Sequence, residues 1–276
     1  MFPKLISVGS FVLPTYGVPV VSGLIVGLMI AARLGQREGL EKDQVYNLGV
    51  YLALAGIIGS KAALIIQEWD YYRLNPSHLF SFATLQSGGI FYGGLIAAIL
   101  TGVWYTRRSR LPFLKTADAF APGVAVGHAL GRMGCFAAGC CWGEPTSLPW
   151  GVTFTNPYSR EIVGVPLNVP LHPTQLYEAL AELGIFVFLY SQFRKKQFDG
   201  QILGWYLLLY STARFVIEIF RSHAVDAVLW EGGLSAAQGI SLVLFGIGIW
   251  LLWLGPYRRQ QLSTAFASSH RPASHK

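Results

Sequence analysis

The chain alternates between long apolar stretches and short polar segments. A helix needs roughly 20 mostly apolar residues to cross the ~30 Å hydrocarbon core of a bilayer, and seven stretches of about this length are present. They cover residues 16–33, 47–67, 88–106, 116–135, 174–193, 201–220 and 234–254. The pattern therefore predicts an all-α, polytopic integral membrane protein with seven transmembrane helices.

The composition supports this class of protein. The 276 residues are 53% hydrophobic and only 13% charged, whereas a soluble domain carries about 25% charged residues. These values exclude a disordered chain and disfavour a soluble globule. Many small-solute transporters have an internal repeat, and the sequence has none, which counts against a transporter.

The basic residues predict how the spans are oriented. Most of the Lys and Arg residues follow the first, third, fifth and seventh stretches. Because cytoplasmic loops carry an excess of Lys and Arg, we expect the N-terminus outside and the C-terminus in the cytoplasm. The same placement accounts for the net charge of +7 without a nucleic-acid partner.

Two longer polar segments accompany the expected spans. Residues 136–172 are rich in Pro, Gly and aromatic residues, and we expect them to form a loop on the outer side of a membrane domain over 1–258. Residues 259–276 are polar and rich in Ser and Ala, a composition that predicts a disordered cytoplasmic tail.

Several charged residues fall within the expected spans, and the candidates for a functional role among them are Lys61, Asp118, Arg132, Arg214 and Glu218. A charge near the centre of a bilayer costs at least a few kcal/mol, so such residues usually face a protein interior or a wet cavity. Some could simply join helices, as Arg214 and Glu218 could at a spacing of four residues. However, two guanidinium groups are more than one carboxylate needs, and their planar geometry suits a phosphate. We therefore expect Arg132 and Arg214 to bind an anionic lipid head group.

Glycines surround these arginines and also open the third stretch. One group lies in the segment 88–94, and another flanks Arg132 at positions 131, 134, 139 and 143. Small residues let helices approach one another closely. They also let the backbone approach a ligand or line a cavity. The spacing of the glycines alone leaves both interpretations open.

Three cysteines lie near the outer end of the fourth stretch, and one histidine lies where the fifth begins. Cys135 could form a disulfide with Cys140 or Cys141 in an oxidising compartment. A nucleophilic cysteine would need a base such as His172 or His128. A metal site lacks a fourth ligand at finger-like spacing. Buried, inert thiols are the simplest interpretation.

At these residues the sequence resembles the prolipoprotein diacylglyceryl transferase family. The matching segments occur in the family's order over roughly residues 14–255. They are Tyr16-Gly17, the segment 88–94, Asp118 with Ala121-Pro122, the segment 131–136, Trp142-Gly143, the segment 172–178, and Tyr210 with Arg214, Glu218, Phe220 and Arg221. Any one of these motifs is weak, but the ordered set is highly specific.

The resemblance implies a function. The family transfers a diacylglyceryl group from phosphatidylglycerol to the lipobox cysteine thiol of a preprolipoprotein in the bacterial inner membrane. Glycerol 1-phosphate leaves, and no metal or soluble cofactor takes part. The resemblance places Arg132 on the phosphate and Arg214 on the head group or leaving group.

The expected site residues follow from the same alignment of motifs. The catalytic set is Arg132, Arg214, Tyr92, His172 and Glu218. The expected substrate-binding residues are Arg132, Tyr16, Lys61, Gly93, Gly94, Gly134, Gly143, Gln175, Tyr177, Glu178, Tyr210 and Arg221.

The sequence departs from the family pattern within the motifs themselves. Tyr92 replaces the usual histidine, Cys135 an asparagine, Cys140 a glutamate and Lys61 an arginine. His172 is therefore our candidate for the base. Two alternatives remain: a non-catalytic or altered-specificity lipid- or lipoprotein-binding relative, and a small-solute transporter.

Overall fold

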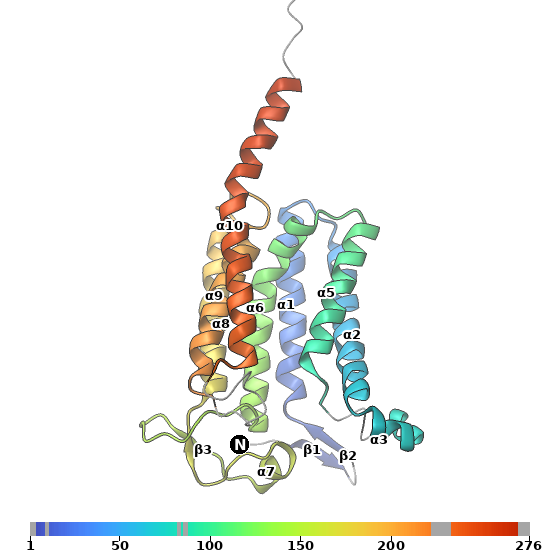
Figure 1. Cartoon of the computed structure of the whole chain (residues 1–276), viewed down its shortest axis with the longest axis vertical. Helices are drawn as coiled ribbons and strands as arrows, with labels where there is room; N and C mark the ends of the chain where they lie inside the picture. Colours follow the sequence, from blue (N-terminus) through green and yellow to red (C-terminus); the bar gives the residue numbers. More distant parts are fainter. Residues whose placement is uncertain (1–3, 9–10, 82–83, 85–87, 222–232, 270–276) are drawn as a thin grey trace, which may run out of the picture. The chain divides into compact units, whose positions relative to one another are not determined.

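The computed structural model describes residues 4–8, 11–81, 84, 88–221 and 233–269 (Figure 1). In this part of the chain, the structure is helical apart from two short two-stranded sheets. The predicted all-α class is therefore confirmed. The chain forms two compact units, one made of residues 1–31 and 117–276 and the other of residues 32–116.

Each predicted span coincides with a long helix. The helices are α1 (Gly17–Arg37), α2 (Lys42–Gln67), α3 (Trp69–Leu74), the 3-10 helix η1 (Pro76–Phe80), α5 (Phe91–Arg108), α6 (Phe113–Ala138), α7 (Pro157–Val163), α8 (Thr174–Phe193), α9 (Gln201–Glu218) and α10 (Ala236–Ser269). Among the described residues, four helical segments are long and apolar enough to cross a membrane: α1, α2, α8 and the part of α10 over Ala236–Gly255. The chain is thus a multi-pass membrane protein, while the count of seven spans and their orientation stay predictions.

The last helix extends past residue 259, where the tail is expected to begin, and the disordered cytoplasmic tail stays a prediction. α10 continues to Ser269, so residues 259–269 are helical, and residues 270–276 lie outside the described part. The segment after position 259 contains Gln, Leu and Ala, which lose little side-chain freedom in a helix. These residues let the apolar helix continue into the polar segment.

The unit of residues 32–116 is built around the pairing of α2 with α5. A Cβ at Gly93 would lie 2.6 Å from the carbonyl oxygen of Gly59, and one at Gly94 would lie 2.7 Å from that of Gly56. The two helix backbones therefore touch at these glycines. For Gly93 and Gly94 the geometry favours helix packing over ligand contact.

The other unit contains α6, α8, α9 and α10, with α9 packed against both α8 and α10 (Figure 1). The first part of α1 belongs to it as well, and a Cβ at Gly27 would lie 2.6 Å from the carbonyl oxygen of Gly123 in α6. This contact of small residues sets α1 directly against the α6 backbone.

Asp118 joins α6 to the start of α9. Its carboxylate accepts hydrogen bonds from the backbone N–H of Gly200 at 2.8 Å and of Leu203 at 2.9 Å, and Lys196 Nζ lies 3.3 Å away. The carboxylate thus satisfies N–H groups in the first turn of α9, which have no partner within that helix. Asp118 therefore has a structural role rather than a place in a wet cavity.

The segment 136–172 is more ordered than a simple loop. It contains strand β3 (Val152–Thr153), which pairs antiparallel with β4 (Pro170–Leu171), and the short helix α7 between them. Phe154, Val165 and Leu171 form a small buried core of its own. A second hairpin of β1 (Lys4–Val8) and β2 (Phe11–Pro14) precedes α1. The apolar residues within 136–172 explain why this segment folds.

Candidate active site

Three helices of the larger unit bring their charged residues together. Six members of this arginine–carboxylate cluster form pairs spaced four residues apart: His128 and Arg132 on α6, Glu178 and Glu182 on α8, and Arg214 and Glu218 on α9. Residues four apart lie on one face of a helix, so each helix presents two polar side chains to the others. Arg221, just after α9, completes the cluster.

Arg132 is held on two sides. Its Nη2 lies 2.7 Å from Glu178 Oε1, and its Nε donates a hydrogen bond to His128 Nε2 at 3.2 Å. Since arginine Nε always carries a proton, His128 accepts at Nε2 and carries its own proton on Nδ1. Nδ1 lies 2.7 Å from Glu182 Oε1 and donates to it. Glu182, His128 and Arg132 thus form a chain of hydrogen bonds that fixes the guanidinium.

Arg214 and Arg221 share the carboxylate of Glu218. Arg214 Nη1 donates to Glu218 Oε2, while Arg221 Nη1 lies 3.9 Å from the same oxygen. The other oxygen of Glu218 accepts a hydrogen bond from Ser235 Oγ at 3.0 Å. Arg214 Nε also lies 4.0 Å from Glu178 Oε1. Glu178 therefore links the two arginines that the sequence predicted as a pair.

These contacts correct one step of the sequence argument. We counted two guanidinium groups against a single carboxylate, but three glutamates take part. The side chains of Glu178, Glu182 and Glu218 are only 1–5% exposed, whereas those of Arg132, Arg214 and Arg221 are 12–20% exposed. The carboxylates are thus more buried than the guanidinium groups that they contact. A guanidinium has five N–H donors, so a carboxylate contact leaves donors for a further anion.

Tyr16 and Tyr210 also lie in the larger unit. Gly134 allows Tyr16 to pack against α6, because a Cβ there would lie 2.9 Å from the Tyr16 carbonyl oxygen. The Tyr210 ring centroid lies 5.7 Å from that of His128, at the edge of the arginine–carboxylate cluster.

His172 lies where β4 leads into α8. Its Nδ1 lies 3.1 Å from the hydroxyl of Tyr177, which also accepts a hydrogen bond from Trp150 Nε1 at 2.8 Å. The His172 ring packs against Phe220, with centroids 5.3 Å apart. Gly143 donates its N–H to the His172 carbonyl at 3.0 Å. His172, Tyr177 and Gly143 are thus brought together, in a polar and aromatic group at the start of α8.

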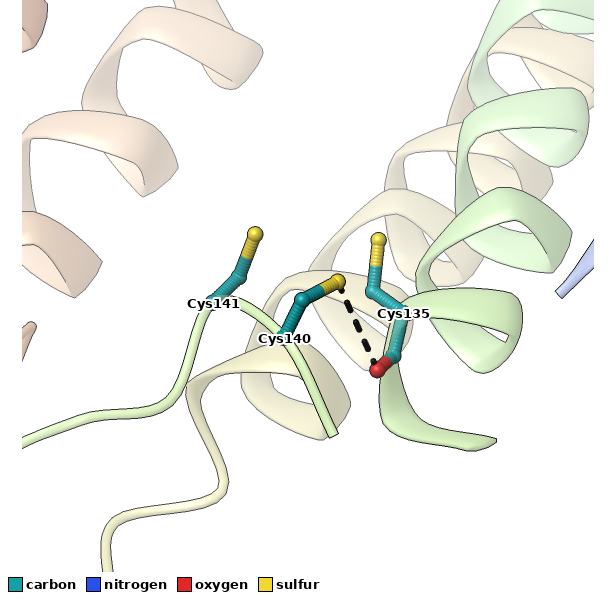
Figure 2. A group of neighbouring side chains, drawn as sticks. All are labelled: Cys135, Cys140 and Cys141. Carbon is teal, nitrogen blue, oxygen red and sulfur yellow. Dashed lines mark hydrogen bonds between the residues drawn. The ribbon is translucent and has the colours of Figure 1, made fainter. Parts of the chain in front are cut away.

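The three cysteines also converge, at the end of α6 (Figure 2). Their Sγ atoms all lie within 4.8 Å of one another, and all three thiols are free. Gln175, which we expected to bind substrate, donates from Nε2 to the Cys140 carbonyl at 2.6 Å. Gln175 therefore fixes the backbone that carries two of the thiols.

Four of the predicted site residues belong to the unit of residues 32–116: Tyr92, Lys61, Gly93 and Gly94. Tyr92 is 42% exposed on α5. Lys61 Nζ donates to the carbonyl of Thr84 at 2.7 Å. These contacts are internal to that unit, so the proposed roles of Tyr92 and Lys61 stay predictions.

Sequence reasoning missed Glu182, and it considered His128 only as a base for a nucleophilic cysteine. The sequence contains a signal for both residues. His128 lies four residues before Arg132, and Glu182 lies four residues after Glu178. The repeated spacing of four would have placed them on the same helix faces.

Most of the chain also matches a known family. The family model described as prolipoprotein diacylglyceryl transferase matches residues 3–254. The chain belongs to this family. The resemblance inferred from the ordered motifs is therefore confirmed over nearly the full length.

Members of the prolipoprotein diacylglyceryl transferase family from several bacteria are similar to the chain over most of their length. A protein of Finegoldia magna is 34% identical over 236 residues, which cover 85% of this chain and 88% of that protein. One of Clostridioides difficile is 35% identical over 229 residues, covering 83% and 85%. One of Acaryochloris marina is 32% identical over 271 residues, covering 96% and 95%. All three are named phosphatidylglycerol–prolipoprotein diacylglyceryl transferase.

Proposed function

We propose that the chain transfers a diacylglyceryl group from phosphatidylglycerol to the lipobox cysteine of preprolipoproteins in the bacterial inner membrane. The observation that carries the proposal is the match to the prolipoprotein diacylglyceryl transferase family over residues 3–254. The partners are then phosphatidylglycerol and a preprolipoprotein signal peptide.

The reaction is a displacement at carbon. The cysteine sulfur of the acceptor forms a bond to the glyceryl carbon, and the bond from that carbon to the phosphate ester oxygen breaks. The electron pair leaves with that oxygen, so the products are a thioether and glycerol 1-phosphate. The thiol proton passes to a base, because the thiolate is the reactive form.

Arg132 and Arg214 are proposed to bind the phosphate and stabilise the charge that grows on the leaving oxygen. Fixed cationic donors aimed at such a charge lower the barrier. The buried carboxylates of Glu178 and Glu218 support this role, because their ion pairs hold both guanidinium groups in place. His128 and Glu182 act as positioning residues for Arg132.

Other predicted residues are assigned to the lipid as well. Tyr16, Tyr210 and Arg221 are proposed as further contacts to the head group. Gly134 and Gly143 are proposed as positions where the backbone approaches the lipid closely. His172 is the candidate for the base. It lies at the start of α8, and its Nδ1 is within hydrogen-bond distance of the Tyr177 hydroxyl.

Transfer by the purified protein tests the function. The full chain, in nanodiscs containing phosphatidylglycerol, is incubated with a lipobox peptide, and the peptide mass is measured. We expect addition of one diacylglyceryl group and release of glycerol phosphate. A peptide that stays unmodified, while phosphatidylglycerol still binds, would instead support the non-catalytic relative.

Matched variants assign the roles. Arg132→Lys keeps the positive charge beside Glu178 but loses the planar donor set, so we expect transfer to fall at least about tenfold. Arg160→Gln is the control, because Arg160 is exposed on α7. Glu182→Gln should lower transfer less than Arg132→Lys does, and it should raise KM for the lipid if Glu182 acts through Arg132.

The base needs a separate comparison. His172→Gln should lower transfer, and the loss should shrink as pH rises, because more of the acceptor thiol then ionises without help. Tyr92→Phe tests the residue that replaces the family's histidine. Unchanged transfer in both variants would remove base catalysis from either residue.

A further inference from the structure

The thiol cluster of Cys135, Cys140 and Cys141 is a feature that the transfer reaction does not use. Cys135 lies in the last turn of α6, and the other two lie in the segment that follows. Figure 2 shows the three side chains with their sulfur atoms on the same side of this segment. The Sγ atoms lie within 4.8 Å of one another, and all three residues are partly buried.

We propose that these three cysteines bind a soft monovalent metal ion, Cu(I), through three sulfur ligands. A metal–thiolate bond is about 2.3 Å long, so three sulfurs around one ion in a plane lie about 4 Å apart. The three Sγ atoms lie no more than 4.8 Å apart, so the sulfur atoms are close enough to share one ion. Thiolates are the ligands that Cu(I) prefers.

The number of ligands selects the ion. Zn²⁺ in structural sites takes four protein ligands. Among the residues that the structure describes, the group contains three potential ligands. The sequence has no fourth ligand at the spacing of a zinc finger, which disfavours a Zn²⁺ site of that kind. Cu(I), in contrast, readily accepts three sulfur ligands. The arrangement therefore fits Cu(I) better than Zn²⁺.

The backbone that carries the cluster is held in an unusual conformation. Cys141 has a φ of 62°, a left-handed conformation that residues other than glycine rarely adopt. Thr174 Oγ1 donates to the Cys141 carbonyl at 2.7 Å, and Gln175 Nε2 donates to the Cys140 carbonyl at 2.6 Å. Both donors are buried at the start of α8. These hydrogen bonds fix two ligands before any ion arrives, as partners outside the ligand shell do in metal sites.

A Cu(I) titration tests the proposal, and lipid transfer takes no part in it. The full chain is purified in mild detergent without oxygen, reduced, and titrated with Cu(I) in competition with a coloured chelator. We expect one Cu(I) per chain. X-ray absorption of the loaded protein should show three sulfurs at about 2.3 Å.

Variants of the ligands make the test specific. Removing a residue that only hydrogen-bonds to a metal ligand lowers metal affinity about 10- to 100-fold. Removing a ligand itself should cost more, so each Cys→Ser variant should lose at least about 100-fold in Cu(I) affinity. Met133→Leu is the matched control, because it removes a soft sulfur from the same end of α6 at a 43% exposed position. It should bind Cu(I) like the parent protein. Monodispersity in detergent is measured for every variant to show that it is folded. The X-ray absorption spectrum uses the parent protein alone, so it tests the site even if a variant fails to fold.

Three results would overturn the proposal. The first is Cu(I) binding that survives all three Cys→Ser substitutions together. The second is tighter binding of Zn²⁺ than of Cu(I). The third is recovery of only one reactive thiol from the unreduced, metal-stripped protein, which would assign the other two to a disulfide.

Discussion

The ion pair of Arg132 with Glu178 makes a prediction about stability that is separate from catalysis. Arg132→Gln removes a guanidinium that lies 2.7 Å from a carboxylate with a side chain only 4% exposed. Removing one partner of a buried pair costs about 3–5 kcal/mol. His128 Nε2 at 3.5 Å and Arg214 Nε at 4.0 Å remain beside the same oxygen. We therefore expect the lower end of that range, about 3 kcal/mol.

The double variant Arg132→Gln/Glu178→Gln isolates the cause. It removes both charges, so no uncompensated carboxylate stays buried. We expect it to be more stable than Arg132→Gln alone by about 1–2 kcal/mol, although it carries one more substitution.

Thermal unfolding in one detergent measures both effects. For a chain of this size, 1 kcal/mol shifts Tm by about 2–4 °C, so Arg132→Gln should lower Tm by about 6–12 °C and the double variant by less. Arg160→Gln should leave Tm within about 1 °C, because the side chain is exposed. If the stability losses measured for Arg132→Gln and for Glu178→Gln as single variants simply add in the double variant, the two side chains are not paired as described.

Two further substitutions test the packing that supports the site. Gly143→Ala should lower the free energy of unfolding by about 1–3 kcal/mol, because a Cβ there would lie 2.6 Å from His172 Cβ. A Cβ at Gly131 would meet no atom within 4 Å, so Gly131→Ala should not destabilise the protein. Equal losses of stability in the two variants would contradict the close packing at Gly143. Asp118→Asn should cost about 1–3 kcal/mol, because one oxygen cannot accept both N–H groups at the start of α9. Asp199→Asn, at a 45% exposed side chain, should change stability by less than about 0.5 kcal/mol, and denaturant unfolding compares the two.

The long helices could be predicted from the sequence because an apolar stretch of spanning length has few alternatives. The predicted stretch 174–193 coincides with α8, and 201–220 differs from α9 by two residues. The tail expected from residue 259 stays a prediction, and α10 extends past that residue to Ser269, because composition indicates polarity rather than the point where a helix ends.

The partners across helices could not be predicted. Spacing of four residues places Arg214 and Glu218 on one face, but Glu178 lies 46 residues from Arg132 in the chain, and their contact depends on how α6 and α8 pack. For this reason the number of carboxylates near the arginines could not be predicted from the sequence.

The short strands in the segment 136–172 were missed for a related reason. β3 and β4 have two residues each, too few for a periodic pattern. Their pairing depends on the small core around Phe154, which brings distant residues together. The convergence of the three thiols likewise depends on the left-handed backbone at Cys141, which the sequence does not specify.

The central claim is that Arg132 and Arg214 bind the phosphate of a glycerolipid while buried carboxylates hold them in place. The most direct measurement is an experimental structure of the full chain in nanodiscs made with phosphatidylglycerol. We predict a lipid phosphate within hydrogen-bond distance of both guanidinium groups, with Glu178 and Glu218 still in contact with them. A head group bound elsewhere, with both arginines enclosed by carboxylates and packed side chains, would contradict the account.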